Sequence, residues 1–182
     1  MRQRSSRPNR ASFGAGRRPP TVSALSTGVR LVSQRAHSRV ELRRKLGRRG
    51  YPADEIEAAL SRLVELGYLN DLSFAEGLVR HRSASRGPRA LSAELAARGV
   101  QKAAADAAVA GFDPEAQLAS ATVLAERLYA RKPASGYREM LDRVGSKLMR
   151  RGFSATTVRA ACWTVLSRTS EGTEDLAPPP DV

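Results

Sequence analysis

Several features that mark large classes of proteins are missing from this chain, or nearly so. A single cysteine, Cys162, excludes an internal disulfide and fits a reducing compartment. No apolar run approaches the roughly 20 residues that cross a bilayer. The arginine-rich N-terminus also lacks the apolar core of a signal peptide. These absences favour a cytoplasmic protein that makes no membrane contact.

Residues of catalytic, metal and cofactor sites are equally scarce. The two histidines, His37 and His81, stand among arginines, without the cysteines and carboxylates of a metal site. Cys162 falls beside Trp163 on the apolar face of a predicted helix, which indicates a small core residue rather than a nucleophile. No glycine-rich phosphate loop follows a predicted strand. We therefore expect no catalysis, no metal and no cofactor.

Acidic residues are few relative to basic ones. Lys and Arg number 31 against 18 Asp and Glu, a formal net charge of +13. Without the six arginines of residues 1–20 and the four acids of residues 170–182, the chain still holds 25 basic and 14 acidic residues. This balance suggests a polyanionic or acidic partner, most often nucleic acid, although a solvated basic face would give the same count.

Aromatic residues make up only 5% of the chain. Base stacking on aromatic side chains is therefore not expected to dominate any nucleic-acid binding. We expect contacts with the phosphates of single- or double-stranded DNA, and an affinity that falls as salt rises.

The two ends of the chain differ from the part between them. Residues 1–20 are mainly Arg, Ser, Pro and Gly, and residues 170–182 are polar, acidic and rich in proline. Neither segment can bury enough apolar surface to fold, so we expect a disordered basic tail and a disordered acidic tail. Between them nearly every segment has helical periodicity, which predicts an all-α protein.

A threefold repeat organises the helical part. Aligning Gly50, Gly99 and Gly152 gives a period of 49 and then 53 residues. An arginine precedes each glycine, an apolar residue follows it, and apolar residues recur on both sides. The aligned sets are Arg49, Arg98, Arg151; Tyr51, Val100, Phe153; Leu46, Leu95, Leu148; Leu42, Leu91, Val144; Ile56, Ala105, Val158; Leu60, Val109, Cys162; and Leu63, Phe112, Val165. So many matches in one frame predict a structural repeat.

Each repeat is predicted to contain three helices. The aligned glycine ends one helix with a left-handed residue, and a second helix follows it. Ser38 with Glu41 predicts a capping box, and Asp71, or Ser73 with Glu76, predicts the start of the next helix. The helices in front of the aligned pairs are placed at about 22–35, 72–83 and 115–131.

Units this small must lean on their neighbours to bury their apolar stripes. We therefore expect three tandem three-helix repeats in an elongated array. The expected boundaries are 21–69 for repeat 1, 70–112 for repeat 2 and 113–169 for repeat 3.

Basic residues gather in three places that could contact a polyanion. Arg44 and Arg48 point away from the apolar stripe of their helix, so packing does not require them. The recurring arginine before each glycine also has a local explanation, because the helix dipole stabilises a cation in the last turn by roughly 0.3–1 kcal/mol. The predicted binding surface comprises Arg43, Arg44, Lys45, Arg48, Arg49, Arg80, Arg82, Arg86, Arg89, Arg98, Lys147, Arg150 and Arg151.

The alternative is a basic helical DNA-binding protein, of helix-turn-helix type or nonspecific, that acts alone. In a helix-turn-helix, residues 53–66 would enter the major groove. This helix carries four acids and one arginine, so phosphates would repel it. The alternative stays open, but charge disfavours the helix-turn-helix form.

Two stretches resemble the RecX family, whose members regulate the RecA recombinase. VRLVSQRAHSRVELRRKLGRRGY, residues 29–51, is similar to the opening repeat of that family. LGYLNDLSFAEGLVRHRSASRGPRALSAELAARGV, residues 66–100, matches the next repeat. Residues 115–166 match more loosely, and together the three units cover nearly everything between the tails.

The resemblance implies a crescent of three tandem three-helix repeats and a non-catalytic regulator. Such a regulator would bind the RecA filament on single-stranded DNA, in the groove of that filament. It would limit strand exchange, ATP hydrolysis and the RecA-stimulated (coprotease) cleavage of repressors in recombination and SOS repair. We expect it to act as a monomer.

Overall fold

The computed structural model describes residues 21–169, and the two tails predicted for residues 1–20 and 170–182 lie outside them. Every element within residues 21–169 is helical, which confirms the all-α prediction. The elements are α1 (Ala24–Gln34), α2 (Arg39–Gly47), α3 (Ala53–Glu65), α4 (Asp71–Arg82), α5 (Pro88–Ala97), α6 (Lys102–Ala110), α7 (Pro114–Arg131), α8 (Tyr137–Met140), η1 (Leu141–Gly145), α9 (Ser146–Arg150) and α10 (Ala155–Thr169). In this range no helix has both the length and the apolarity to span a membrane.

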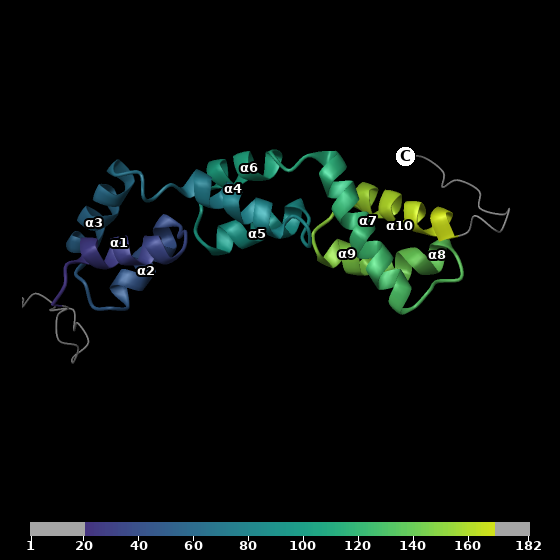
Figure 1. The fold of residues 1–182 in the computed structure, drawn as a ribbon, viewed down its shortest axis with the longest axis horizontal. Coiled ribbons are helices and arrows are strands. Elements are labelled where there is room, and N and C mark those ends of the chain that lie inside the picture. Colours follow the sequence, from purple (N-terminus) through teal and green to yellow (C-terminus); the bar gives the residue numbers. More distant parts are fainter. Residues whose placement is uncertain (1–20, 170–182) are drawn as a thin grey trace, which may run out of the picture.

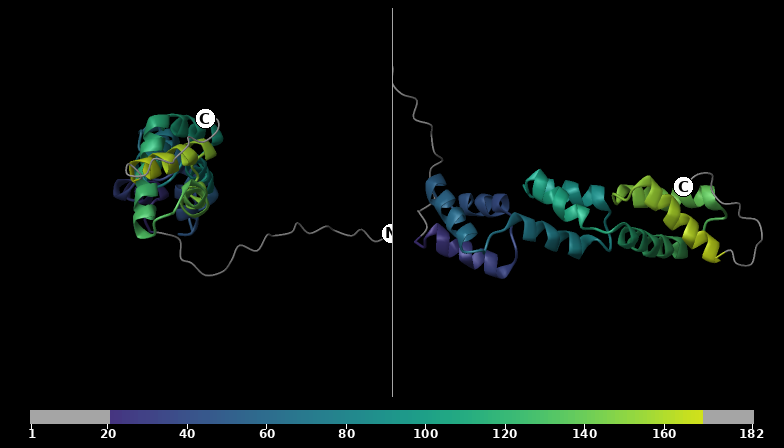
Figure 2. Two further views of the ribbon diagram at one scale, coloured as in Figure 1. Left: turned by 90° about the vertical axis from the view of Figure 1, so that its right-hand side faces the viewer. Right: turned by 90° about the horizontal axis from the view of Figure 1, so that it is seen from above.

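The helices form three units that lie in a row (Figure 1). The first unit is α1–α3, the second is α4–α6, and the third is α7, the continuous α8–η1–α9 helix and α10. All extensive helix pairing lies within a unit. The row is long in the two side views and compact when seen end-on (Figure 2), and in Figure 1 its middle unit is displaced upward, so the row is bowed. The predicted elongated, curved array is therefore confirmed.

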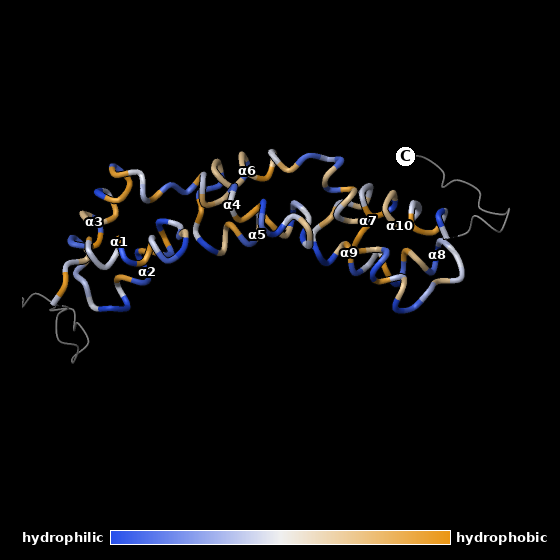
Figure 3. Tube along the Cα trace, in the orientation of Figure 1, coloured by the Kyte–Doolittle hydropathy of each residue, from blue (hydrophilic) through white to orange (hydrophobic). Residues whose placement is uncertain are grey.

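Each unit has its own apolar core. Leu42, Leu46, Leu60 and Leu63 are fully buried in the first unit, and burial of each leucine contributes about 1.5–3 kcal/mol. The second unit is built around α4, α5 and α6, and the third around α7, α9 and α10. Hydrophobic stretches accordingly recur in all three units and alternate with hydrophilic turns (Figure 3).

The core of the second unit receives only small side chains from its last helix, α6. From α6 only Ala105 and Ala108 are fully buried. Val109 is half-buried, although its repeat partners Leu60 and Cys162 are fully enclosed. The repeat frame nevertheless holds in α6, because Ala108 aligns with Ala59 and Ala161, which are buried as well.

The aligned glycines adopt the backbone conformation that the repeat predicted. Their φ angles are +91° at Gly50, +76° at Gly99 and +88° at Gly152, a region that favours glycine because it has no Cβ. The next amide in two of these turns reaches back five residues, from Val100 to the carbonyl of Leu95 and from Phe153 to that of Leu148. This is the pattern of a glycine-terminated helix.

The starts of two helices, α2 and α4, differ in part from the predicted caps. The Ser38 hydroxyl accepts from the Glu41 amide at 3.1 Å, as a capping box requires, but the Glu41 carboxylate turns to two arginines instead of the helix start. The cap of α4 is Asn70, whose side-chain oxygen accepts from the amides of Leu72 and Ser73. Neither Asp71 nor Ser73 therefore caps this helix. Asp71 instead accepts from the Arg39 amide at 2.8 Å.

The longer second period has a structural origin. The residues that cap the three middle helices, Ser38, Gly87 and Gly136, are spaced by 49 residues each time. The four additional residues therefore lie inside the middle helix of the third unit. Four residues are close to one helical turn of 3.6 residues, so the apolar face is kept, and the same helix contains the π-helical segment Leu141–Gly145.

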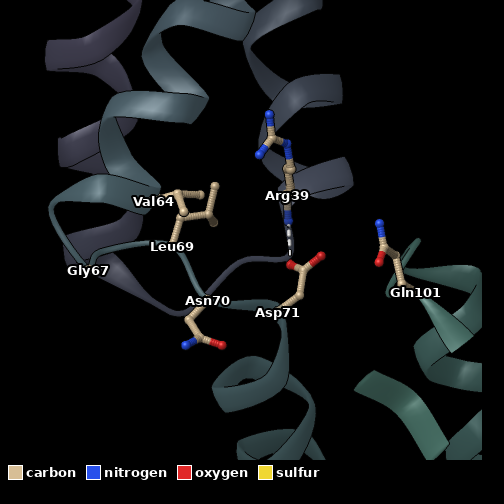
Figure 4. A pocket seen from close by; sticks show the side chains of 7 residues that line it. All are labelled: Arg39, Val64, Gly67, Leu69, Asn70, Asp71 and Gln101. Atoms are coloured by element: carbon tan, nitrogen blue, oxygen red, sulfur yellow. Dashed lines mark hydrogen bonds between the residues drawn. The ribbon is translucent and has the colours of Figure 1, made fainter. Parts of the chain in front are cut away.

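The joint between the first and second units places the start of α2 on the turn between α5 and α6. The Ser38 hydroxyl, which is buried, donates to the Arg98 carbonyl at 2.6 Å. The Val40 side chain fills the space that a Cβ on Gly99 would need, at 2.5 Å. The Arg98 guanidinium donates to Glu41 at 3.1 Å. On the other side of this joint the Arg39 amide meets Asp71 (Figure 4).

The joint between the second and third units repeats this arrangement one unit further along. The start of α5 lies on the turn between α9 and α10. The Gly87 amide donates to the Arg151 carbonyl at 2.9 Å, and the Arg89 amide donates to the Gly152 carbonyl at 3.2 Å. A Cβ on Gly87 would lie 2.4 Å from the Phe153 nitrogen. At both joints, the N-terminus of a middle helix docks on the next glycine turn.

The second joint predicts that Gly87→Ala destabilises the protein although its backbone angles suit any residue. The added methyl meets backbone atoms that cannot move aside, so the unfolding free energy should fall by about 1–3 kcal/mol. Gly77→Ala is the matched control, since Gly77 lies within α4 with open space around it. The control should gain about 0.5–1 kcal/mol from helix propensity. Urea unfolding of the two variants checks both signs, and equal effects would contradict the close approach at this joint.

Candidate functional site

The first cluster of predicted binding residues surrounds a hollow on α2. Arg44, Lys45 and Arg48 line it together with Arg35 and Glu41, and its volume is about 240 Å³. Four cations therefore face one carboxylate across a space open to solvent. Such an arrangement can accept an anion such as a phosphodiester, because the cations already repel one another.

Lys45 shows the effect of this crowding. Burial, followed by the positive charges of Arg35, Arg49 and Arg48, lowers the pKa of the Lys45 ammonium. Its Nζ lies 2.7 Å from Nε2 of His37. Because an ammonium only donates, Nε2 accepts this bond. Nδ1 of the same ring is then the protonated nitrogen and donates to the Arg35 carbonyl at 2.8 Å.

His37 is therefore held neutral beneath the basic hollow. Its side chain is buried, and burial is the main cause that lowers the pKa of its imidazole, ahead of the charges of Arg35 and Lys45. Protonation of the ring would replace the hydrogen bond to Lys45 with a repulsion between two cations. The imidazole thus positions Lys45 only in its neutral form.

The other two predicted residues on α2 do not line the hollow. Arg43 turns to α3 and forms a bidentate pair with Glu57 at 2.5 and 2.7 Å. The pair raises the pKa of Arg43 and lowers that of Glu57. The Arg49 guanidinium donates to the Lys45 carbonyl in the last turn of the helix, as the helix-dipole explanation expects.

The second cluster is largely engaged within the protein. Arg82, Arg86 and Arg98 converge on Glu94, at 4.0, 3.7 and 2.9 Å, and Glu94 is only 16% exposed. Arg98 also bridges to the first unit through Glu41. Arg80 lies apart, in a hollow between the second and third units that Asp113 and Glu76 also line. Of this cluster, Arg89 is exposed and forms no side-chain ion pair within the described residues.

The third cluster lies on the last unit. Lys147 lines a hollow of about 420 Å³ that Arg131, Lys132 and Arg143 share with one carboxylate, Asp142. Arg150 and Arg151 are exposed on the same helix end, and Arg151 also reaches the Ser85 carbonyl at 3.4 Å. This hollow is the second place in residues 21–169 where several cations face one open space.

Four cations of these hollows, Arg35, Arg131, Lys132 and Arg143, are absent from the predicted binding surface. The first three lie where the first helix of a repeat ends, at Gln34 for α1 and at Arg131 for α7. The basic pair at 131–132 could have been recognised from the sequence, since it lies at the end of the helix predicted at about 115–131 and directly precedes Pro133. Its proximity to Lys147 depends on how α7 packs against η1 and α9, which no local pattern reveals.

The described residues provide little for other kinds of chemistry. No group of three or more His, Cys, Asp or Glu side chains within residues 21–169 could hold a metal ion. Cys162 is fully buried, and burial raises the pKa of its thiol to about 11, so it is a core residue rather than a thiolate nucleophile.

The lowered pKa of His37 predicts a loss of stability in mild acid. Since the unfolded chain binds a proton more readily than the native one, stability is complete above the ordinary value of 6.5 and falls as pH drops below it. His37→Asn keeps a donor for the Arg35 carbonyl and should flatten the pH dependence of the unfolding free energy between pH 7.5 and 5. His81→Asn, at an exposed histidine on α4, is the control and should keep the slope of the parent protein. Parallel slopes for the parent and His37→Asn would refute the buried neutral imidazole.

Comparison with known proteins gives matches to one family. Residues 24–63 match the description "RecX, first three-helix domain", and residues 70–109 match "RecX, second three-helix domain". The chain is 38% identical over 136 residues to "Regulatory protein RecX" of Mycolicibacterium vanbaalenii, covering 70% of this chain and 74% of that protein. It is 36% identical over 159 residues to the protein of the same name from Mycobacterium marinum, covering 82% and 90%.

Two solved structures share the fold. "Crystal structure of RecX from Lactobacillus salivarius" superimposes with a TM-score of 0.73 at 23% identity, covering 79% of this chain and 95% of that one. "Crystal structure of regulatory protein RecX" gives 0.67 at 25% identity, covering 74% and 68%. The array of three-helix units is thus an architecture that other proteins of this name also have.

Proposed function

The chain belongs to the RecX family of regulatory proteins, and from this membership we propose that it regulates the RecA recombinase. It binds the RecA filament on single-stranded DNA without catalysing a reaction itself. Its action is inhibitory, limiting strand exchange, ATP hydrolysis and the coprotease function of RecA. Family membership is the observation that carries this proposal.

The shape and charge of the described residues support a groove-binding mode. A bowed row of three units can follow a helical groove over several subunits of a polymer (Figures 1 and 2). The two cationic hollows lie on the first and third units, so phosphates could be contacted at both ends of the row. The DNA contacts are then made through phosphates and are sensitive to salt. In dilute solution the protein is a monomer of the cytoplasm.

The alternative is a DNA-binding protein that acts without RecA. In a helix-turn-helix mode, α3 would have to enter the major groove. Glu55 on α3 accepts from the Ala24 amide at 2.8 Å, and Glu57 pairs with Arg43, so its acids are used to hold α1 and α2. These contacts favour α3 as a structural helix and leave phosphate binding to α2 and to the third unit.

The proposal predicts inhibition of RecA at low stoichiometry. In an assay of RecA ATP hydrolysis on single-stranded DNA, the protein is titrated at two salt concentrations. We expect half-inhibition well below one copy per RecA, and inhibition that persists at the higher salt. Inhibition that appears only near saturation of the DNA and vanishes with salt would instead favour simple competition for phosphates.

The two cationic hollows predict a defined salt dependence of DNA binding. Each phosphate contact contributes about 0.7 to the slope of log affinity against log salt for a single strand. Arg44→Ala and Lys147→Ala, both at exposed positions, should each lower the magnitude of that slope by about 0.7, and their combination by about 1.4. Arg62→Ala removes an exposed arginine paired with Glu65 on α3 and is the control. Fluorescence anisotropy measures the slopes, and an unchanged slope in the double variant would exclude these hollows as the phosphate sites.

A further inference from the structure

Within residues 21–169, the joint that holds the units together leaves one copy of each of its two surfaces without a partner. The joint connects the N-terminus of a middle helix to the glycine turn of the following unit. In this range no unit docks on the glycine turn of the first unit, Arg49–Gly50, and the N-terminus of the third middle helix, at Gly136, docks on no further unit. The α2–α3 and α7–α8 connections, which carry these surfaces, lie at opposite ends of the row (Figure 1).

Residues that take part in a joint are more buried than their counterparts at the two ends of the row. Gly152 is buried in its joint, Gly99 is half-buried, and Gly50 is exposed. Among the capping residues, Ser38 and Gly87 are buried, but Gly136 is half-buried. A Cβ added to Gly50 or to Gly136 would meet nothing within 4 Å, whereas one added at Gly87, Gly99 or Gly152 would collide with the neighbouring unit.

The hydrogen-bonding groups of the two free surfaces match the pairs already formed. At the second joint, Gly87 and Arg89 donate their amides to the carbonyls of Arg151 and Gly152. Gly136 and Arg138 occupy the same places at the start of α8 as Gly87 and Arg89 do at α5. Within residues 21–169, no acceptor is found for their two amides and no donor for the carbonyls of Arg49 and Gly50.

The charges are complementary as well. At the first joint, Arg98 precedes the glycine and pairs with Glu41, three residues after the cap of α2. Arg49 stands in the place of Arg98. Glu139 stands in the place of Glu41, three residues after Gly136. Glu139 accepts from Ser135 and Arg143, which lower the pKa of its carboxyl to about 2. It is therefore ionised. Its Oε2 accepts from both the amide and the hydroxyl of Ser135, whereas Oε1 accepts from Arg143 and keeps a second lone pair for Arg49 of a neighbour.

We propose that the protein associates with copies of itself head to tail, the Gly136 end of one copy docking on the Arg49–Gly50 turn of the next. The contact continues the internal joint from one chain to another, so two rows form one longer row. It is a heterologous contact, which propagates instead of closing at a dimer. Its small area makes it weak between free molecules. On a polymer that holds copies side by side, the high effective concentration would favour it.

This association does not depend on the regulation of RecA, so it is tested on the full chain alone. Sedimentation equilibrium is measured at protein concentrations from about 0.05 to about 1 mM, a range in which a weak contact is partly formed. The buffer contains enough salt to screen the net charge of the chain. We expect the average mass to rise with concentration beyond that of a dimer. A constant monomer mass, or a limit at the dimer, would overturn the proposal.

Charge reversal locates the contact. Arg49→Glu and Glu139→Arg should each reduce association at least tenfold, because each places like charges across the interface. Combining both changes in one chain, or mixing the two single variants, should restore association, since every turn then meets an opposite charge on another copy. Arg30→Glu, at an exposed position on α1, is the control with the same change of net charge as Arg49→Glu, and it should associate like the parent.

The double variant keeps the test valid even if Glu139→Arg destabilises the start of α8, because its regained association cannot result from that damage. Association that survives both single reversals would assign the contact to another surface, such as the exposed apolar side chains Val64, Leu66, Tyr68 and Leu72, and would refute the proposal. Failure of the double variant to regain association while its circular dichroism matches that of the parent would also refute it.

Discussion

The structure depends on one contact, the docking of a helix N-terminus on a glycine turn. It requires a residue without a Cβ on the receiving side, because Val40 and Ala90 come within 2.6 Å of where a Cβ on Gly99 or Gly152 would lie. It also requires donors on the entering side, which Ser38, Gly87 and Arg89 supply. Since all extensive helix packing lies inside single units, these few contacts set the direction of the whole row.

The same contact divides the arginines into two kinds. Arg98 holds the first joint together, and Arg82 and Arg86 share its partner Glu94. These three arginines of the middle unit therefore contribute to the contacts within and between units. In the first and third units, several cations line open hollows instead. These cationic hollows lie toward the two ends of the row, as the proposed phosphate contacts with a long polyanion require.

The repeat, its glycines and the all-α fold could be predicted from the sequence because they depend on local periodicity and on the left-handed conformation that glycine favours. Contacts between units could not. Glu41 satisfies a capping-box pattern, yet its carboxylate pairs with Arg35 and Arg98, 57 residues away. Arg98 was predicted as a binding residue because the sequence does not reveal that Glu41 and Glu94 neutralise its charge. Charge and exposure can be read from a sequence, but the partner that neutralises a charge depends on tertiary packing.

The most direct measurement of this account is the distance distribution across one joint. Spin labels at Lys102→Cys on α6 and Thr156→Cys on α10 lie at exposed positions on neighbouring units, and the buried Cys162 stays unlabelled. Double electron–electron resonance should give one narrow distribution in the parent chain and a broad one when Gly87→Asp closes the space for docking. Equally broad distributions in both chains would show that the units move independently, and would contradict a row whose shape is set by its glycine turns.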